Sequence, residues 1–131
     1  MRKLTLFTAL VFSLLVFSST SFADWKRVSE NADGYTFYVD FERIRKHGGF
    51  VYYWYLTDYL KPNAKGILSG KIYVQSDCKL FRFKYLSASF HKEPMGEGTG
   101  QMNNDPDKEW KYPIPNSSME IILKYVCAYA K

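Results

Sequence analysis

FVYYWYLTDY, residues 50–59, carries the strongest strand signal in the chain, because aromatic and β-branched residues fill it. Successive side chains of a strand point to opposite faces, so this stretch divides into two sets. We expect the even-numbered set to form the core: Phe50, Tyr52, Trp54, Leu56 and Asp58. The odd-numbered set then forms a tyrosine stripe that another layer covers: Val51, Tyr53, Tyr55, Thr57 and Tyr59.

Further strands are predicted on both sides of this stretch. Their composition, with turn residues between the runs, marks residues 25–29, 35–40, 71–77 and 79–90. The first two are joined by a turn at Asn31–Gly34, and the last two by a turn near Asp77–Lys79 that no glycine marks. Between strands, Asp40 is a candidate cap for one helical turn that ends before Gly48-Gly49.

Residues 91–109 contain several glycines and Pro106, which predicts a long loop or a loose hairpin. The run Gly96-Glu97-Gly98-Thr99-Gly100 does not form a phosphate cradle, because a cradle needs a buried strand before it and a helix after it. A last short strand is predicted at residues 110–112.

The C-terminal segment changes from strand to helical periodicity. Ser117 and Glu120 form the Ser-x-x-Glu capping box that opens a helix. Apolar residues then recur at the spacing of one helix face: Met119, Ile122, Leu123 and Val126. Cys127 borders this face, so the helix is expected to pack on the sheet and to be tied to it through Cys78. The predicted fold class is α+β, with one sheet and a C-terminal helix on one of its faces.

Cys78 and Cys127 are the two cysteines of the chain. An exported protein with two cysteines is expected to form one disulfide. A redox or metal role is not supported, because no Cys-x-x-Cys motif exists and neither His47 nor His91 stands at ligand spacing from a cysteine.

The N-terminus has the parts of a cleavable secretory signal peptide, predicted over residues 1–23. Arg2 and Lys3 supply a basic start, residues 4–17 are mostly apolar, and small residues up to Ala23 suit signal peptidase. The apolar run is short for a membrane-spanning helix, which needs roughly 20 residues. An uncleaved anchor is the alternative. No cysteine lies near the cleavage point, so a lipoprotein is not expected.

Removal of the signal peptide leaves residues 24–131, the length of one domain. Losing Arg2 and Lys3 lowers the formal charge from +5 to +3, and no run of like charges remains, so nucleic-acid binding is not supported. Aromatic residues are dense, and tyrosine leads them with 11 positions. Tyrosine favours strands and supplies amphipathic contact surfaces.

A single helix covers only one face of the sheet, and aromatic side chains remain on the other. We therefore predict a second layer formed by another copy of the chain, which makes the protein a homodimer. The candidate binding or dimer face comprises Tyr53, Tyr55, Tyr59, Arg82 and Lys84. The alternative for the tyrosines is packing under the helix or within the dimer interface.

A series of motifs runs in order along residues 24–131. It comprises Trp25, Tyr38-Val39-Asp40, Arg43-Ile44 with the glycine pair, Trp54, Asp77-Cys78-Lys79, Met95-Gly96 with Gly98, Trp110, and Pro115-Asn116-Ser117 before the helix that ends in Cys127. This ordered set, with both cysteines, resembles the bacterial surface-adhesin protein E family over nearly the whole range.

The resemblance implies an antiparallel sheet of about six strands, a C-terminal helix tethered by a disulfide, and dimers. It also implies, from the founding member, adhesion to host extracellular matrix proteins. This chain departs from the founding pattern, because it lacks the lipidated cysteine that anchors that pattern at the membrane. Fold transfers more readily than function across such a resemblance.

No catalytic constellation is predicted, so we expect neither an enzyme nor a cofactor or metal. Ser87 and Ser89 precede His91 on an extended strand, but nothing indicates an oxyanion site, and a solvated strand end is the simpler interpretation. Asp40 and Asp58 are expected to cap turns or form surface ion pairs rather than to act as acid and base.

The sequence therefore predicts an exported binding module, periplasmic or at the cell surface, whose partner is a protein. Host matrix adhesion is the form of binding that the resemblance implies. The alternative is a soluble periplasmic protein that binds a small ligand, with residues 91–109 closing over a pocket. No transmembrane segment is expected after signal cleavage.

Overall fold

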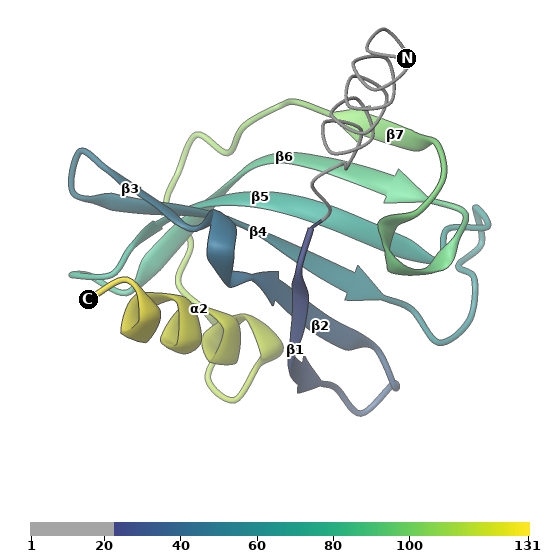
Figure 1. Cartoon of the computed structure of the whole chain (residues 1–131), viewed down its shortest axis with the longest axis horizontal. Coiled ribbons are helices and arrows are strands. Elements are labelled where there is room, and N and C mark those ends of the chain that lie inside the picture. The colour runs from purple at the N-terminus through teal and green to yellow at the C-terminus, as the bar shows by residue number, and fades with distance from the viewer. Residues whose placement is uncertain (1–22) are drawn as a thin grey trace, which may run out of the picture.

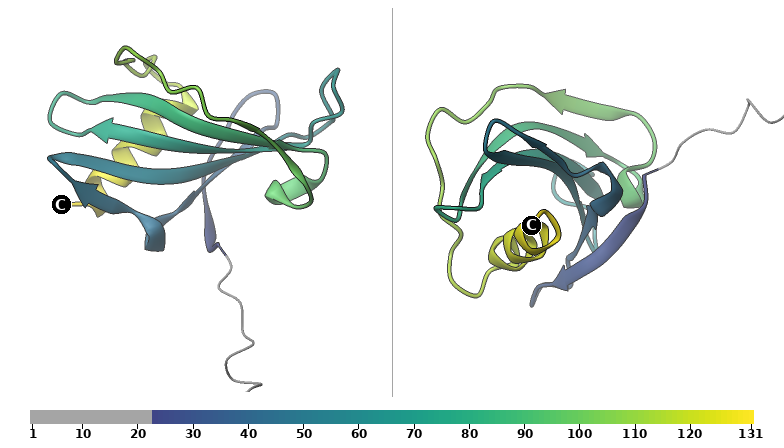
Figure 2. Two further views of the ribbon diagram at one scale, coloured as in Figure 1. Left: turned by 90° about the horizontal axis from the view of Figure 1, so that it is seen from above. Right: turned by 60° about the vertical axis from the view of Figure 1, so that its left-hand side comes forward.

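The computed structural model describes residues 23–131, which form one antiparallel sheet with a helix in its curved face (Figures 1 and 2). The sheet has seven strands, six of them in the order β1-β2-β4-β5-β6-β7, and β3 pairs with β4 alone. The predicted fold class is confirmed. The predicted signal peptide lies outside the described residues.

Ten elements follow one another along the described chain. The strands are β1 (Trp25–Glu30), β2 (Thr36–Asp40), β3 (Arg45–His47), β4 (Phe50–Asp58), β5 (Ser69–Asp77), β6 (Arg82–His91) and β7 (Gly100–Asn103). Two 3₁₀ turns are η1 (Phe41–Arg43) and η2 (Pro94–Gly96), and the helix is α2 (Ser118–Tyr129). The sequence did not predict β3. It pairs with β4 because Gly48 and Gly49 adopt φ values of 59° and 83°, which close a tight hairpin between them.

The hairpin between β5 and β6 turns at the predicted place, and the Asp77 side chain holds it. Asp77 Oδ1 accepts hydrogen bonds from the backbone N–H groups of Lys79 and Leu80 at 3.1 and 3.2 Å. Its Oδ2 accepts a hydrogen bond from Arg82 Nε at 2.9 Å. A carboxylate that bonds the backbone ahead of it stabilises a turn without glycine.

The expected cap of η1 is wrong in its detail. A helical turn does follow Asp40, but the Asp40 side chain makes no capping hydrogen bond. Asp40 Oδ2 instead lies 3.5 Å from Arg43 Nε, and Oδ1 is buried without a hydrogen-bond partner among the described residues.

The helix packs on the odd-numbered face of β4, which reverses the expectation for this strand. We call this face of the sheet concave and the opposite face convex, because the sheet curls around α2 (Figure 2). Tyr53 is fully buried on the concave face, and Val51, Tyr55 and Thr57 are each 7% exposed. The even-numbered aromatic residues lie half-buried on the convex face: Phe50, Tyr52 and Trp54. Both faces are aromatic, so alternation alone could not tell which one the helix covers.

Helix α2 begins with the predicted cap. Ser117 Oγ accepts a hydrogen bond from the backbone N–H of Glu120 at 3.2 Å. The carboxylate of Glu120 returns to the N–H of Asn116 at 3.4 Å, one residue before the cap. Ile122, Leu123 and Val126 are fully buried, as the helical period predicted. Burial of each of these side chains contributes roughly 1.5–3 kcal/mol.

The predicted disulfide joins Cys127 of α2 to Cys78 just after β5, with Cα atoms 5.6 Å apart and a sequence separation of 49. It ties the last turns of the helix to the β5–β6 hairpin. Near the other end of the helix, Ser118 Oγ lies 3.3 Å from Ser29 Oγ of β1. The helix is thus held to the sheet at both ends.

Residues 91–109 fold along both faces of the sheet, and the hairpin alternative holds for part of them. β7 pairs with β6, and further along the same edge Lys111 forms a single bridge with Phe83. That bridge replaces the strand predicted at residues 110–112, and together these pairs cover the free edge of β6. On the convex face, η2 lies over β4, where Asp58 Oδ1 accepts a hydrogen bond from the Met95 N–H at 2.8 Å.

Candidate functional site

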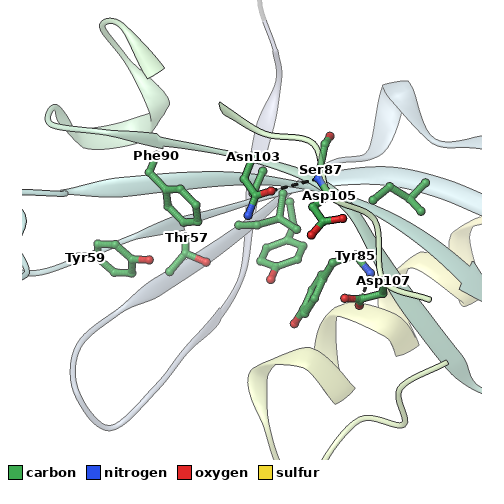
Figure 3. Close-up of a pocket in the computed structure, with 12 residues that line it drawn as sticks. Thr57, Tyr59, Tyr85, Ser87, Phe90, Asn103, Asp105 and Asp107 are labelled. Atoms are coloured by element: carbon green, nitrogen blue, oxygen red, sulfur yellow. Dashed lines mark hydrogen bonds between the residues drawn. The ribbon is translucent and has the colours of Figure 1, made fainter. Parts of the chain in front are cut away.

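A pocket of about 380 Å³ opens on the concave face, beside the helix (Figure 3). Four aromatic residues line it: Tyr55, Tyr59, Tyr85 and Phe90. Aliphatic residues also line it, Ile72, Leu86 and Ala88, and polar residues complete the lining: Thr57, Ser87, Asn103, Asp105 and Asp107. A neighbouring hollow of about 530 Å³ shares Tyr55 and Tyr85 with the pocket and reaches the start of α2. The pocket has the size and the apolar lining of sites that bind small molecules.

A β-bulge in β6 shapes this pocket. Tyr73 of β5 pairs with Ser87, whereas the next residue, Val74, pairs with Tyr85, so the register shifts between them. Asp107 lies against the shifted stretch. Its N–H donates to the Tyr85 carbonyl oxygen at 2.8 Å, and its Oδ2 accepts from the Tyr85 N–H at 2.9 Å. The bulge and these two bonds hold the acidic segment 105–107 at the rim.

Two phenols meet in the wall of the pocket, because the Tyr55 and Tyr85 rings lie 6.5 Å apart and their hydroxyl groups are hydrogen-bonded. Burial raises the pKa of Tyr55 well above its ordinary value, and the neighbouring Tyr85 adds to the rise. Burial also raises the pKa of Tyr85; the bond from Tyr55 opposes this effect and the negative charge of Asp107 adds to it. Both phenols therefore stay neutral at physiological pH.

The convex face carries a second cluster, which we call the Trp110 cluster: Phe50, Arg82, Lys84 and Trp110. The guanidinium carbon of Arg82 lies 4.4 Å from the centroid of the Trp110 ring, and Lys84 Nζ lies 4.8 Å from it. The Phe50 and Trp110 rings are 5.3 Å apart. Two cations thus lie against one indole ring, an arrangement that cation–π attraction stabilises.

An aromatic row continues from this cluster across the convex face, formed by Tyr52, Trp54 and Tyr73. The Trp54 and Tyr73 rings lie 4.9 Å apart, and the Tyr52 and Tyr73 rings are stacked at 6.2 Å. The Tyr52 hydroxyl accepts a hydrogen bond from Gln75 Nε2 at 3.1 Å. Each of the three rings is half-buried, so solvent reaches the row.

The structure does not bring the five predicted face residues together. Tyr53 and Tyr55 lie beneath the helix on the concave face, the packing that the alternative interpretation gave them. Tyr59 lines the pocket on the same face. Arg82 and Lys84 belong to the Trp110 cluster on the convex face. Sequence reasoning missed Trp110 as their partner, because it lies 26 or more residues away along the chain.

Ser89 and His91 are a buried pair, so the expectation of a solvated strand end is wrong. Ser89 Oγ lies 2.9 Å from His91 Nε2, and the two residues are 4% and 3% exposed. His91 Nδ1 lies 3.2 Å from the Gly98 carbonyl oxygen. A Cβ on Gly100 would lie 2.5 Å from the imidazole, so only glycine fits there. The pair anchors the glycine-rich segment and lacks the carboxylate that orients the base of a catalytic triad.

Within residues 23–131, no three His, Cys, Asp or Glu side chains gather closely enough to hold a metal ion. The same part of the chain contains no helix that is long and apolar enough to cross a bilayer.

The family model of surface-adhesin protein E matches residues 25–128. The chain belongs to the surface-adhesin protein E family. The resemblance predicted from the ordered motifs is therefore confirmed, and membership points to a binding protein of the bacterial surface rather than to an enzyme. Among curated proteins, no sequence matches the chain.

Solved structures of protein E from Haemophilus influenzae have the same fold. Crystal form II aligns with a TM-score of 0.64 and 19% identity, over 86% of this chain and 94% of that one. A second structure of the same protein aligns at 0.61 and 18% identity, over 83% and 87% of the two chains. Protein E from a non-typeable strain aligns at 0.57 and 18%, over 85% and 79%. At such identities the likeness establishes the fold of this family member and nothing about its ligand.

Proposed function

We propose that this family member is an exported binding module of the cell envelope, whose convex face binds a host extracellular matrix protein. The Trp110 cluster carries the proposal. Tryptophan, tyrosine and arginine dominate the energetic centres of protein interfaces, and the cluster with its aromatic row presents all three on one solvent-reached face.

Charge supports the same face. Arg82 and Lys84 lie side by side over Trp110, and only Arg82 has a carboxylate partner among the described residues, Asp77. The positive charge of Lys84 is therefore available to a carboxylate of a binding partner. An acidic segment of a matrix protein would meet this cation and stack its apolar groups on the neighbouring rings.

Binding to immobilised matrix proteins tests the proposal, with surface plasmon resonance as the measurement. Lys84→Glu is expected to weaken binding about tenfold, because it reverses the cation at the centre of the face. Trp110→Ala is expected to weaken binding more, in the range of a hot spot. Lys65→Glu, an exposed lysine in the β4–β5 connection, makes the same charge change elsewhere and is expected to bind like the wild type.

Unchanged binding by both Lys84→Glu and Trp110→Ala, with normal melting temperatures, would show that the convex face is not the binding surface.

Whether the domain reaches the cell surface needs a separate test. Antibody labelling of intact cells is expected if the domain reaches the surface. Labelling only after permeabilisation would contradict the adhesin role and favour a periplasmic binding protein.

A second copy of the chain is the competing occupant of the convex face, because the sequence predicts a homodimer through the face that the helix leaves uncovered. Sedimentation equilibrium distinguishes the two. A dimer that Trp110→Ala dissociates would place the self-association surface at the cluster, and matrix binding would then need another surface.

A further inference from the structure

We propose that the concave-face pocket binds an organic cation, a small molecule with a protonated amine and an apolar body. This inference concerns the face opposite the proposed matrix-binding surface and stands independently of it. The pocket lies where α2 stops covering the sheet, so it is a consequence of how far the helix reaches.

The walls of the pocket suit the apolar body of such a molecule. Figure 3 shows Tyr59, Phe90 and Thr57 near one end and Tyr85 toward the other. Tyrosine and phenylalanine rings offer both apolar contact and a negative π face, which attracts an ammonium group. The phenols stay neutral, since burial raises the pKa of both Tyr59 and Tyr85.

The charge of the lining selects a cation. Asp105 and Asp107 are the charged residues that line the pocket, and no lysine or arginine lines it. Lys111 Nζ lies 3.8 Å from Asp107 and compensates that carboxylate in part. Asp105 forms no ion pair with any residue of the described chain, so its charge is available at the rim.

Thr57 gives an observation independent of the acids. Its side chain lies in the pocket lining and is labelled in Figure 3, yet the residue is only 7% exposed. Within residues 23–131, its hydroxyl group makes no hydrogen bond to another protein group. Asp40 Oδ1 is the buried side-chain atom that lacks a partner among the described residues, so the Thr57 hydroxyl is reached by solvent through the pocket and is free to bond an occupant.

The test is an NMR titration of the isotope-labelled protein with 2-phenylethylamine, which carries one aromatic ring and one ammonium group. Saturable shifts of the pocket amides are expected, including those of Tyr85 and Asn103. The matched probes 2-phenylethanol and phenylacetate have the same ring without the cation, and we expect each to bind at least about tenfold more weakly, one power of ten in the dissociation constant.

Matched variants locate the charge. Asp105→Asn is expected to weaken 2-phenylethylamine binding about fivefold, and Thr57→Val about threefold. Glu109→Gln removes one carboxylate from the same segment outside the pocket lining and is expected to bind like the wild type. If Asp105→Asn and Glu109→Gln weakened 2-phenylethylamine binding equally, the overall charge of the protein would explain the effect, and the proposal would be overturned.

Two further results would also overturn it: equal binding of the three probes, or no saturable shift with 2-phenylethylamine at millimolar concentration. The outcome is separable from the proposed matrix binding. Asp105→Asn is expected to leave adhesion unchanged, and Lys84→Glu is expected to leave amine binding unchanged, because the two residues lie on opposite faces.

Discussion

Asp77 shows how much one side chain contributes to this fold. It lies 6% exposed at the end of β5, where it bonds two backbone N–H groups of the turn and the guanidinium of Arg82. Burial opposes ionisation, but the bonds from Arg82 and from the backbone N–H groups outweigh it, so the pKa of Asp77 is lowered. The same Arg82 contacts Trp110, so the turn also positions the convex face.

Asp77→Asn is expected to lower the free energy of unfolding at neutral pH, because the ionised carboxylate loses its bond to Arg82. Because the pKa of Asp77 is lower in the folded protein than in the unfolded chain, its charge stabilises the fold at pH values above the unfolded-state pKa of about 4. This contribution is lost as the pH falls through the pKa of the folded state. The difference between wild type and variant should therefore shrink on acidification. Urea unfolding from pH 7 down to pH 2 measures it.

Asp33→Asn, in the exposed β1–β2 turn, is the control for removing one carboxylate. If the difference in free energy of unfolding between the wild type and Asp77→Asn stayed constant from pH 7 to pH 2, the charge of Asp77 would contribute nothing to stability.

The helix α2 illustrates how an element combines local and tertiary signals. Its start follows from Ser117 and its buried face from the apolar spacing, both local features of the sequence. An isolated helix of 12 residues is marginal in water, so contact of its buried face with the sheet and the disulfide stabilise it.

Ser117→Ala is expected to destabilise the protein by about 1 kcal/mol, because the N–H of Glu120 loses its acceptor. Ser117→Asp keeps an acceptor at the cap and is expected to restore most of that free energy. Chemical unfolding monitored by circular dichroism provides the measurement. If Ser117→Asp were as unstable as Ser117→Ala, the cap would not be the cause.

The whole molecule depends on the link between its last element and its centre. The Cys78–Cys127 bond joins α2 to the β5–β6 hairpin, across 49 residues that include the acidic rim of the pocket. Such a bond limits the freedom of the unfolded chain, and the effect grows with the length of the closed loop.

Replacing both cysteines with serine is expected to lower the free energy of unfolding by about 2–4 kcal/mol. Wild-type protein treated with dithiothreitol should lose a similar amount, which controls for the packing of the serine side chains. A loss below about 1 kcal/mol in both would mean that helix packing alone holds the two parts together.

Local patterns along the chain were enough to predict most strands and the capped helix, because these rest on neighbours or on simple periods in the sequence. The disulfide followed from two cysteines in a chain predicted to be exported, and the family from a resemblance carried by the ordered motifs. The Gly48-Gly49 hairpin was visible only as a break, since β3 exists through its pairing with β4. Likewise, β7 exists through its pairing with β6.

Tertiary structure alone decided which face of the sheet became the core. The alternating residues of β4 are aromatic on both sides, so the expectation that the side of Trp54 forms the core was wrong, because α2 covers the side of Tyr53. Tertiary structure also decided which residues come together in the Trp110 cluster and in the concave-face pocket. Trp110 meets Lys84, and Asp105 and Thr57 line the same pocket, although long stretches of chain separate the members of each pair. A sequence records which side chains are present, but the encounter of distant ones depends on how the layers pack.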